Sequence, residues 1–115
     1  MSTEIGRRAE TAAADYLEHE GHLIIDRNWR TRWCEIDIVT MRDATIYFVE
    51  VKYRVRPLQG TGLEYVTRRK LERMHFAAES WLAANDRDGS HEYRLSAIEL
   101  TGDPPGVTQW LPDVG

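Results

Sequence analysis

The chain has 115 residues, of which 42% are hydrophobic and 30% charged, and its formal net charge is −4. We expect one globular domain over residues 1–115, because the length suits a single core and no apolar run is long enough to cross a membrane. The single cysteine, Cys34, excludes a disulfide framework, and the first residues lack the apolar stretch of a secretory signal, so we expect a cytoplasmic protein.

The order of apolar, polar and turn residues predicts an alternation of helices and strands. Helical spacing predicts one helix over 4–19, ended by Gly21, and a second helix over 67–84. Strands are predicted over 22–30, 33–41, 46–54 and 92–100, with a loop over 55–65 and a turn over 86–90. The segment 101–115 is predicted to be a short tail or an edge arm, in which 107–111 forms either an edge strand or a docking arm.

Two of these strands carry charge where a strand is normally apolar. If the second and third strands form an antiparallel hairpin with its turn at 43–44, Asp37 faces Glu50 and Glu35 faces Lys52. Side chains that face each other lie on one side of the sheet, with Cβ atoms about 5 Å apart. Two carboxylates at this distance repel each other, so the fold must provide a partner for them, and a divalent cation is a candidate.

The rest of the hairpin is apolar on both faces. One face carries Ile36, Ile38, Tyr47, Val49, Val51 and Tyr53, and the other carries Val39, Met41, Ile46 and Phe48. A sheet that is apolar on both faces needs cover on both sides, which the two helices can provide. We therefore predict an α/β fold of three layers, α/β/α, with the acids in a cleft where the helix cover ends.

Carboxylates on neighbouring strands suit Mg²⁺, which binds one or two carboxylates and keeps several waters. Asp37 and Glu50 are therefore candidate ligands, with the backbone carbonyl of Val51 as a third. Such a metal polarises a phosphoryl oxygen and acidifies water, and Lys52 can orient the water or neutralise the phosphate. The alternative is a surface patch in which Glu35 pairs with Lys52 and Asp37 pairs with an arginine.

A further acid, Glu10, lies on the first predicted helix. On a helical wheel it falls near Leu17, at the edge of the apolar face, and Gly6 one turn earlier permits close approach to the sheet. Glu10 can therefore reach the acidic cleft as an accessory acid, and the alternative is an exposed helical glutamate.

Positive charge is concentrated in the middle of the chain. Residues 27–73 hold eleven Lys and Arg against six Asp and Glu, a net charge of +5, and thirteen of the fifteen cations of the chain are arginine. Arginine suits bidentate contacts with phosphate, so this distribution favours a nucleic-acid partner, and solvated surface is the alternative.

The start of the second helix concentrates this charge. Thr67 is the predicted N-cap, and Arg68, Arg69 and Lys70 fill the first turn, where the helix macrodipole disfavours cations. A bound anion would remove the conflict, and charge compensation by Glu64 and Glu72 is the alternative. Among the three cations, Lys70 is expected to point inward most.

Basic and aromatic residues also alternate before the acidic strand. Arg30 and Arg32 are interleaved with Trp29 and Trp33, a mixture that can hold a phosphate backbone and stack on an unpaired base. The alternative for the two tryptophans is a place in the core or over a sheet edge.

These motifs together resemble the YraN-like family of small bacterial proteins. The matching motifs, within Gly6 to Leu100, are Gly6-x-x-x-Glu10, Asn28-Trp29-Arg30, Glu35-Ile36-Asp37-Ile38, Phe48-Val49-Glu50-Val51-Lys52-x-Arg54 and Val66-Thr67-x-x-Lys70. That family is similar to archaeal Holliday junction resolvases and to the restriction-endonuclease-like superfamily. The resemblance implies a mixed sheet between helices, with an antiparallel hairpin that carries a PD-(D/E)xK-type site.

By position, the resemblance assigns a role to five residues. Asp37, Glu50 and Lys52 match the catalytic core, Glu10 matches the helical acid of the resolvase-like branch, and Lys70 matches a lysine at the second helix.

The resulting expectation is a nuclease that uses Mg²⁺ or Mn²⁺ to hydrolyse phosphodiester bonds in structured or branched DNA. The predicted DNA contacts are Arg30, Arg32, Arg54, Arg68, Arg69 and Lys70. The alternative is a module of the same fold that binds nucleic acid or protein without catalysis. A homodimer built on the sheet edge is a further possibility, since two-fold DNA junctions suit a two-fold protein.

Overall fold

The computed structural model describes residues 3–56, 66–85 and 91–115. Its elements in chain order are α1 (Glu4–His19), β1 (Leu23–Arg30), β2 (Glu35–Arg42), β3 (Thr45–Arg54), α2 (Arg68–Asn85), β4 (Glu92–Thr101) and β5 (Gly106–Leu111). The predicted helices and strands are confirmed to within about two residues at their ends. The segment 107–111 belongs to an edge strand. The predicted turn at 86–90 and most of the predicted loop at 55–65 lie outside the described residues.

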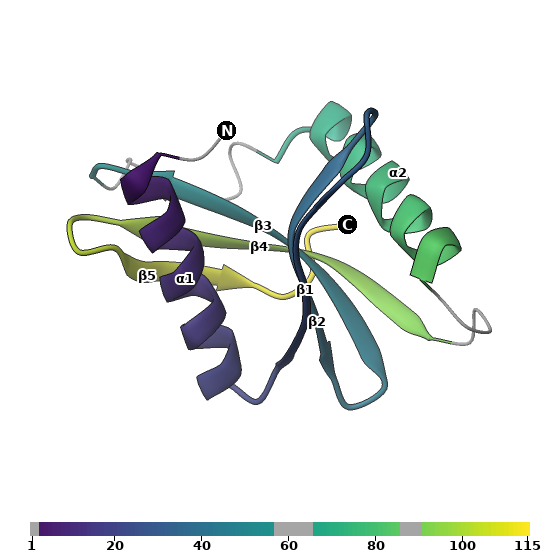
Figure 1. Ribbon diagram of the computed structural model, residues 1–115, viewed down its shortest axis with the longest axis horizontal. Coiled ribbons are helices and arrows are strands. Elements are labelled where there is room, and N and C mark those ends of the chain that lie inside the picture. The colour runs from purple at the N-terminus through teal and green to yellow at the C-terminus, as the bar shows by residue number, and fades with distance from the viewer. Residues whose placement is uncertain (1–2, 57–65, 86–90) are drawn as a thin grey trace.

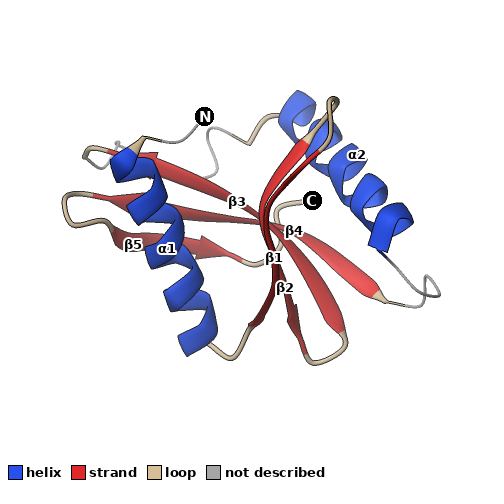
Figure 2. Ribbon diagram, viewed as in Figure 1, coloured by secondary structure: helices blue, strands red, loops and turns tan. Residues whose placement is uncertain are grey.

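The five strands form one mixed sheet in the order β1-β2-β3-β4-β5. β3 and β4 run parallel and the other neighbours are antiparallel. The helix α1 covers one face of the sheet and α2 covers the other, as Figures 1 and 2 show. The predicted three-layer α/β/α arrangement is confirmed. Within the described residues, no helix is long and apolar enough to span a lipid bilayer.

The helix α1 begins and ends with local signals that the sequence carries. The Thr3 hydroxyl accepts a hydrogen bond from the Gly6 N–H at 2.9 Å, which caps the first turn. Gly21 follows the helix with a φ of 93°, a conformation that glycine adopts without strain. Small side chains then let α1 approach the sheet closely. The buried cluster on this side contains Ala13, Ala14, Leu17, Ile38, Val49, Ile98 and Leu100.

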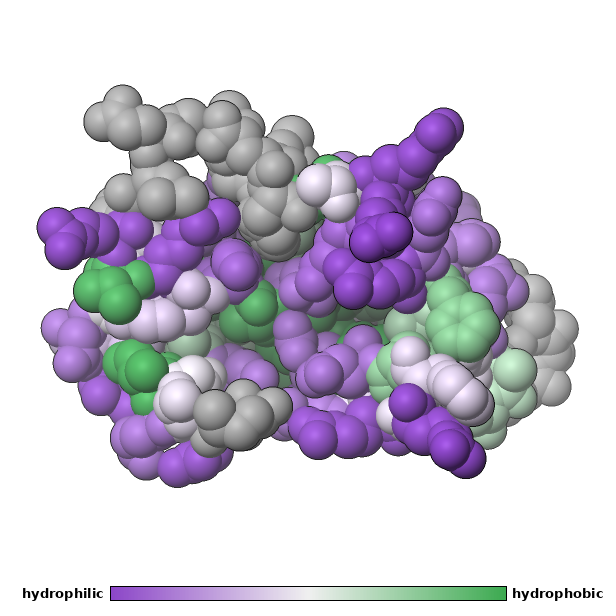
Figure 3. All heavy atoms as spheres, turned by 90° about the horizontal axis from the view of Figure 1, so that it is seen from above, coloured by the Kyte–Doolittle hydropathy of each residue, from purple (hydrophilic) through white to green (hydrophobic). Residues whose placement is uncertain are grey.

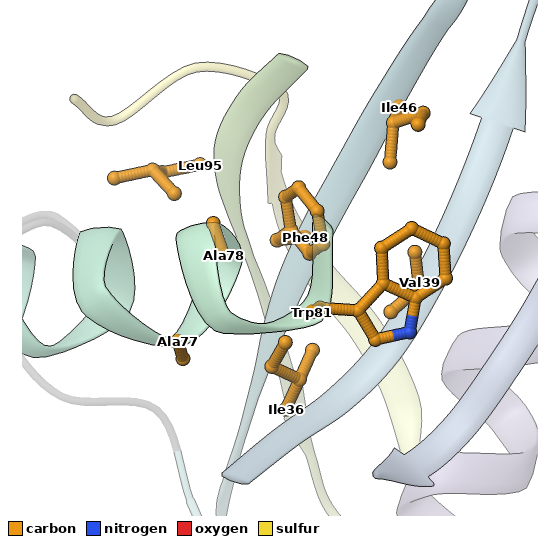
Figure 4. Packing of buried hydrophobic residues seen from close by; sticks show 8 residues of the cluster. All are labelled: Ile36, Val39, Ile46, Phe48, Ala77, Ala78, Trp81 and Leu95. Carbon is orange, nitrogen blue, oxygen red and sulfur yellow. The ribbon is translucent and has the colours of Figure 1, made fainter. Parts of the chain in front are cut away.

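The second half of α2 seals the other face of the sheet. Trp81 packs edge-on against Phe48 with ring centroids 5.6 Å apart (Figure 4). Its indole N–H donates to the Asp26 carboxylate at 2.9 Å. Ala77 and Ala78 bring the helix close to the same cluster. The fully buried residues of α2 therefore lie in its second half, while Leu71 and Met74 in its first half pack against the same cluster only partly buried.

The hairpin of β2 and β3 opens into a fork. Its pairs run from Arg42 opposite Thr45 to Ile38 opposite Val49, in the predicted register. The predicted pairs of Asp37 with Glu50 and of Glu35 with Lys52 do not form in the sheet, because the strands part before them. Beyond the pair of Ile38 and Val49, β2 stays beside β1 while β3 continues beside β4 for five more residues. The ends of the two strands point to different sides of the molecule in Figure 1. We call residues 35–37 and 50–54 the fork.

The expectation that Ile36 shares a face with Ile38 is wrong. Ile36 packs in the cluster under α2, and so does Trp29, its partner on β1. Asn28, level with Asp37 in the register, has a φ of 52°, in the left-handed region that Asn tolerates better than most residues. This residue turns β1 and the paired end of β2, so the regular alternation of faces breaks where the fork begins.

Candidate functional site

A cleft of about 670 Å³ lies between the fork and the first half of α2. Three acids from β2 and β3 line it, namely Glu35, Asp37 and Glu50. Figure 3, which looks down on the end of the molecule where β2 and β3 part, shows a central hollow with a largely polar rim. The remaining lining residues are Trp33, Cys34, Val51, Arg69, Lys70, Glu72, Arg73, Met74 and Phe76.

Asp37 is the most deeply placed of these acids. Its carboxylate accepts a hydrogen bond from the Val51 backbone N–H at 2.8 Å, which bridges the two arms of the fork. Burial, followed by the charge of Glu50, raises the pKa of Asp37 from 3.8 to about 7, against the opposing effect of the Val51 hydrogen bond. Glu10 and Glu35 add smaller increments in the same direction. Asp37 therefore sits where negative charge is in excess.

Glu50 has a cationic partner in α2. The Lys70 ammonium lies 2.7 Å from the Glu50 carboxylate, with the two side chains 27% and 24% exposed. The predicted inward direction of Lys70 is confirmed, since Arg68 and Arg69 in the same turn are exposed. The predicted N-cap is also confirmed, because the Thr67 hydroxyl accepts the Lys70 N–H at 3.2 Å. The conflict of Lys70 with the helix dipole is thus compensated by Glu50.

The other predicted catalytic residues lie around this centre. Lys52 follows Glu50 by two residues on β3 and is partly buried, but it is not among the residues that line the cleft. Glu10 lies on α1, on the other side of the sheet, and acts on Asp37 through its charge alone. Besides Asp37 and Glu50, the acids that line the cleft are Glu35 and Glu72, and Glu10 is not among them.

A ready-made cage of metal ligands does not exist in the described part of the chain. No group of three or more His, Cys, Asp and Glu side chains in residues 3–56, 66–85 and 91–115 is arranged to hold an ion. Two carboxylates, Asp37 and Glu50, do meet in one cleft, and this number is enough for a hydrated Mg²⁺. No ion pair of Asp37 with an arginine occurs among these described residues, so the predicted surface-patch alternative does not describe Asp37.

The predicted DNA contacts fall into two groups. Arg69 and Lys70 line the cleft, while Arg68 is exposed beside them. Arg30 and Arg32 are exposed at the end of β1 and in the following turn. Arg54 differs from the others, because its guanidinium forms an ion pair with Glu99 at 3.0 Å in a largely buried position.

The cleft also contains residues that the sequence argument did not assign to the site. Arg73 lies three and four residues after Lys70 and Arg69, so helical spacing was the available signal for its place on the same side of α2. For Phe76 no sequence signal was available. Whether its side chain is buried or exposed depends on how far the contacts of α2 with the sheet extend along the helix.

Fold and cleft together define a class: a three-layer α/β/α domain whose parted central strands hold an acidic cleft beside a basic helix start. The chain belongs to the uncharacterised protein family UPF0102, whose model matches residues 9–100, and this confirms the resemblance to the YraN-like family.

Bacterial relatives described as UPF0102 proteins are similar over most of their length. One from Rhodopseudomonas palustris is 43% identical over 107 residues, which cover 93% of this chain and 79% of the relative. One from Vibrio parahaemolyticus is 36% identical over 97 residues, covering 84% and 80%. One from Pseudomonas putida is 36% identical over 111 residues, covering 95% and 90%.

Proposed function

We propose that this protein is a metal-dependent nuclease that hydrolyses phosphodiester bonds in structured or branched DNA. The observation that carries the proposal is that Asp37 and Glu50, from two strands that part, line one cleft together with the cations of α2. Carboxylates beside a row of Arg and Lys suit a substrate that is a phosphate and a cofactor that is a cation.

The donor set fits a hard divalent cation. Asp37 and Glu50 would hold Mg²⁺ or Mn²⁺, with the Val51 carbonyl as a further oxygen ligand. The raised pKa of Asp37, caused by burial and by Glu50, marks a position where a cation would remove unfavourable charge. When bound, such an ion polarises a phosphoryl oxygen and acidifies water.

The residues of the chain then share the remaining work. Arg69 and Arg73 hold the DNA backbone at the mouth of the cleft, because guanidinium groups bind phosphate oxygens bidentately. Lys52, two residues after Glu50 on β3 but outside the cleft lining, would turn toward the cleft to orient the attacking water or neutralise charge that develops on the phosphate. Glu10 strengthens the negative field at Asp37 from the far side of the sheet and thereby favours a bound cation.

One observation favours the alternative of a binding module without catalysis. Lys70 neutralises Glu50 at 2.7 Å, so the cleft is partly balanced without any ion. In that case the arginines of α2 serve binding alone, and the acids set which anions are rejected.

Cleavage assays on four-way and flayed DNA with Mn²⁺ separate the two functions. We expect the wild-type chain to cut, and Asp37→Asn and Glu50→Ala to lose more than about 100-fold in rate, since each removes a ligand. Glu18→Gln, which changes an exposed acid of α1, is the matched control and keeps full activity. Equal cutting by wild type and Asp37→Asn overturns the nuclease proposal. DNA binding that weakens with salt, without cutting, supports the binding module.

A further inference from the structure

Two large aromatic side chains are exposed on the rim of the acidic cleft. Trp33 is 74% exposed and Phe76 is 53% exposed, and both line the cleft that contains Asp37 and Glu50. They come from separate parts of the chain, Trp33 from the turn between β1 and β2 and Phe76 from the middle of α2. Within the described residues, only four large apolar side chains are this exposed, and two of them border this one site.

The turn that carries Trp33 is held firmly. The Thr31 hydroxyl accepts the Trp33 N–H at 3.0 Å and the Cys34 N–H at 3.2 Å, and the Thr31 N–H donates to the Cys34 carbonyl at 2.8 Å. The Arg32 guanidinium lies 5.0 Å from the centre of the Trp33 ring. The indole is therefore presented to solvent by a closed turn, with a cation on one ring face.

The surroundings of the two rings indicate what they bind. Arg69 and Arg73 line the same cleft, so a ligand there meets apolar ring faces beside cations that suit phosphate. An unpaired nucleotide combines these two properties, because its base has a free π-face and its phosphate carries charge. A base inside a duplex has both faces covered by its neighbours and cannot stack on a protein ring.

We infer that Trp33 and Phe76 form a stacking platform for unpaired bases, which selects DNA with unpaired nucleotides beside the acidic cleft over fully paired duplex. This inference deepens the proposed function and rests on it, since the cleft is taken to receive DNA. The arginines supply affinity for any phosphate backbone, and the rings supply the preference for flaps, forks and bubbles.

Binding measured without metal tests the platform separately from catalysis. Fluorescence anisotropy in EDTA compares a single strand, the same strand with abasic residues, and a fully paired duplex. We expect Trp33→Ala and Phe76→Ala each to weaken single-strand binding about tenfold and to leave duplex binding unchanged. On the abasic strand, wild type and Trp33→Ala bind equally. Trp33→Phe, which keeps a ring, restores most of the affinity.

Leu23→Ala is the matched control, because Leu23 is 64% exposed and does not line the cleft. It binds all three DNAs as wild type does. The inference is overturned if the two ring variants weaken binding to duplex and abasic strand as much as to the single strand, or change none of them.

These binding data, combined with the cleavage assay on Asp37→Asn, distinguish this inference from the proposed function. Ring-dependent binding of single strands without any Asp37-dependent cutting leaves the platform standing and removes the nuclease. Cutting that depends on Asp37, with single-strand binding indifferent to Trp33 and Phe76, leaves the nuclease standing and removes the platform.

Discussion

The two ends of the β2–β3 hairpin differ sharply in pairing and in charge. At the turn end the strands are fully paired, and Val39, Ile46 and Val49 are buried between the two helices. At the fork the strands separate and acids line the cleft, where Glu50 is paired with Lys70 and Asp37 is buried with a raised pKa. The closed end supplies the stability that allows the open end to keep Asp37 in an unfavourable environment.

Two residues with left-handed backbone mark the two ends. Asp43, with a φ of 56°, lies in the tight turn that closes the hairpin. Asn28, with a φ of 52°, lies on β1 level with Asp37, where the hairpin opens. The same backbone conformation thus accompanies closure at one end and separation at the other, which suggests tests at both.

The largest expected effect is at the closed end. Phe48→Ala removes a buried ring that packs against Trp81 and Tyr93, and we expect the free energy of unfolding to fall by about 3–5 kcal/mol. Phe76→Ala, the matched change at the cleft, removes an exposed ring and is expected to alter it by less than about 0.5 kcal/mol. Urea unfolding measures both, and similar losses for the two variants would contradict the contrast between the ends.

The second largest expected effect on stability concerns the charge of Asp37. Because its pKa is raised from 3.8 to about 7, the folded chain holds a proton that the unfolded chain has already released. The contribution of Asp37 to stability therefore falls as the pH rises from about 4 to about 7, and it is level above that range. At about 1.4 kcal/mol per pKa unit, ionised Asp37 destabilises the fold by up to about 4 kcal/mol.

Asp37→Asn removes this charge and can still accept the Val51 N–H. We expect the variant to be more stable than wild type at pH 8, by an amount that shrinks as the pH falls toward 4. Asp15→Asn, at an exposed position of α1, is the control, and its stability difference from wild type is expected not to shrink in this way as the pH falls. Unfolding curves across this pH range measure the trend, and a stability difference independent of pH contradicts it.

The structure of the closed end could be predicted from the sequence, whereas the structure of the fork could not. Strand alternation and the turn at Asp43 are local signals, and they predicted the register of β2 and β3 correctly from the turn to Ile38 and Val49, but not the separation beyond that pair. The flip of Ile36 coincides with the left-handed backbone of Asn28 on the neighbouring strand, a feature that no periodicity encodes. The pairing of Lys70 with Glu50 depends on how α2 lies across the sheet, so only its inward direction was predictable.

The third prediction concerns that ion pair. Lys70→Met keeps the apolar stem and leaves Glu50 without its cation, and we expect a loss of about 1–2 kcal/mol, between the values for exposed and buried pairs. Arg8→Met breaks an exposed pair with Asp103 and is expected to cost less than about 0.5 kcal/mol. Thermal unfolding compares them.

The same variant tests competition between Lys70 and a divalent cation. Without Lys70, Glu50 is available to Mn²⁺, so added Mn²⁺ should raise the melting temperature of Lys70→Met more than that of wild type. An equal rise in both proteins would mean that the Lys70 ammonium and the ion do not share Glu50.

The smallest expected effect on stability is at Asn28, and it bears most directly on how the fork forms. Asn28→Ala keeps a Cβ in the left-handed region but removes the side-chain amide that makes this conformation tolerable, and we expect a loss of about 1 kcal/mol, whereas Asn28→Gly is nearly neutral. Hydrogen exchange of the Val51 amide, which donates to Asp37, provides a local measurement of the fork. If the turn of β1 holds the fork in shape, the Val51 amide loses protection in Asn28→Ala beyond the global change in stability. Protection that follows global stability alone would mean that β2 and β3 separate for reasons that lie within the hairpin itself.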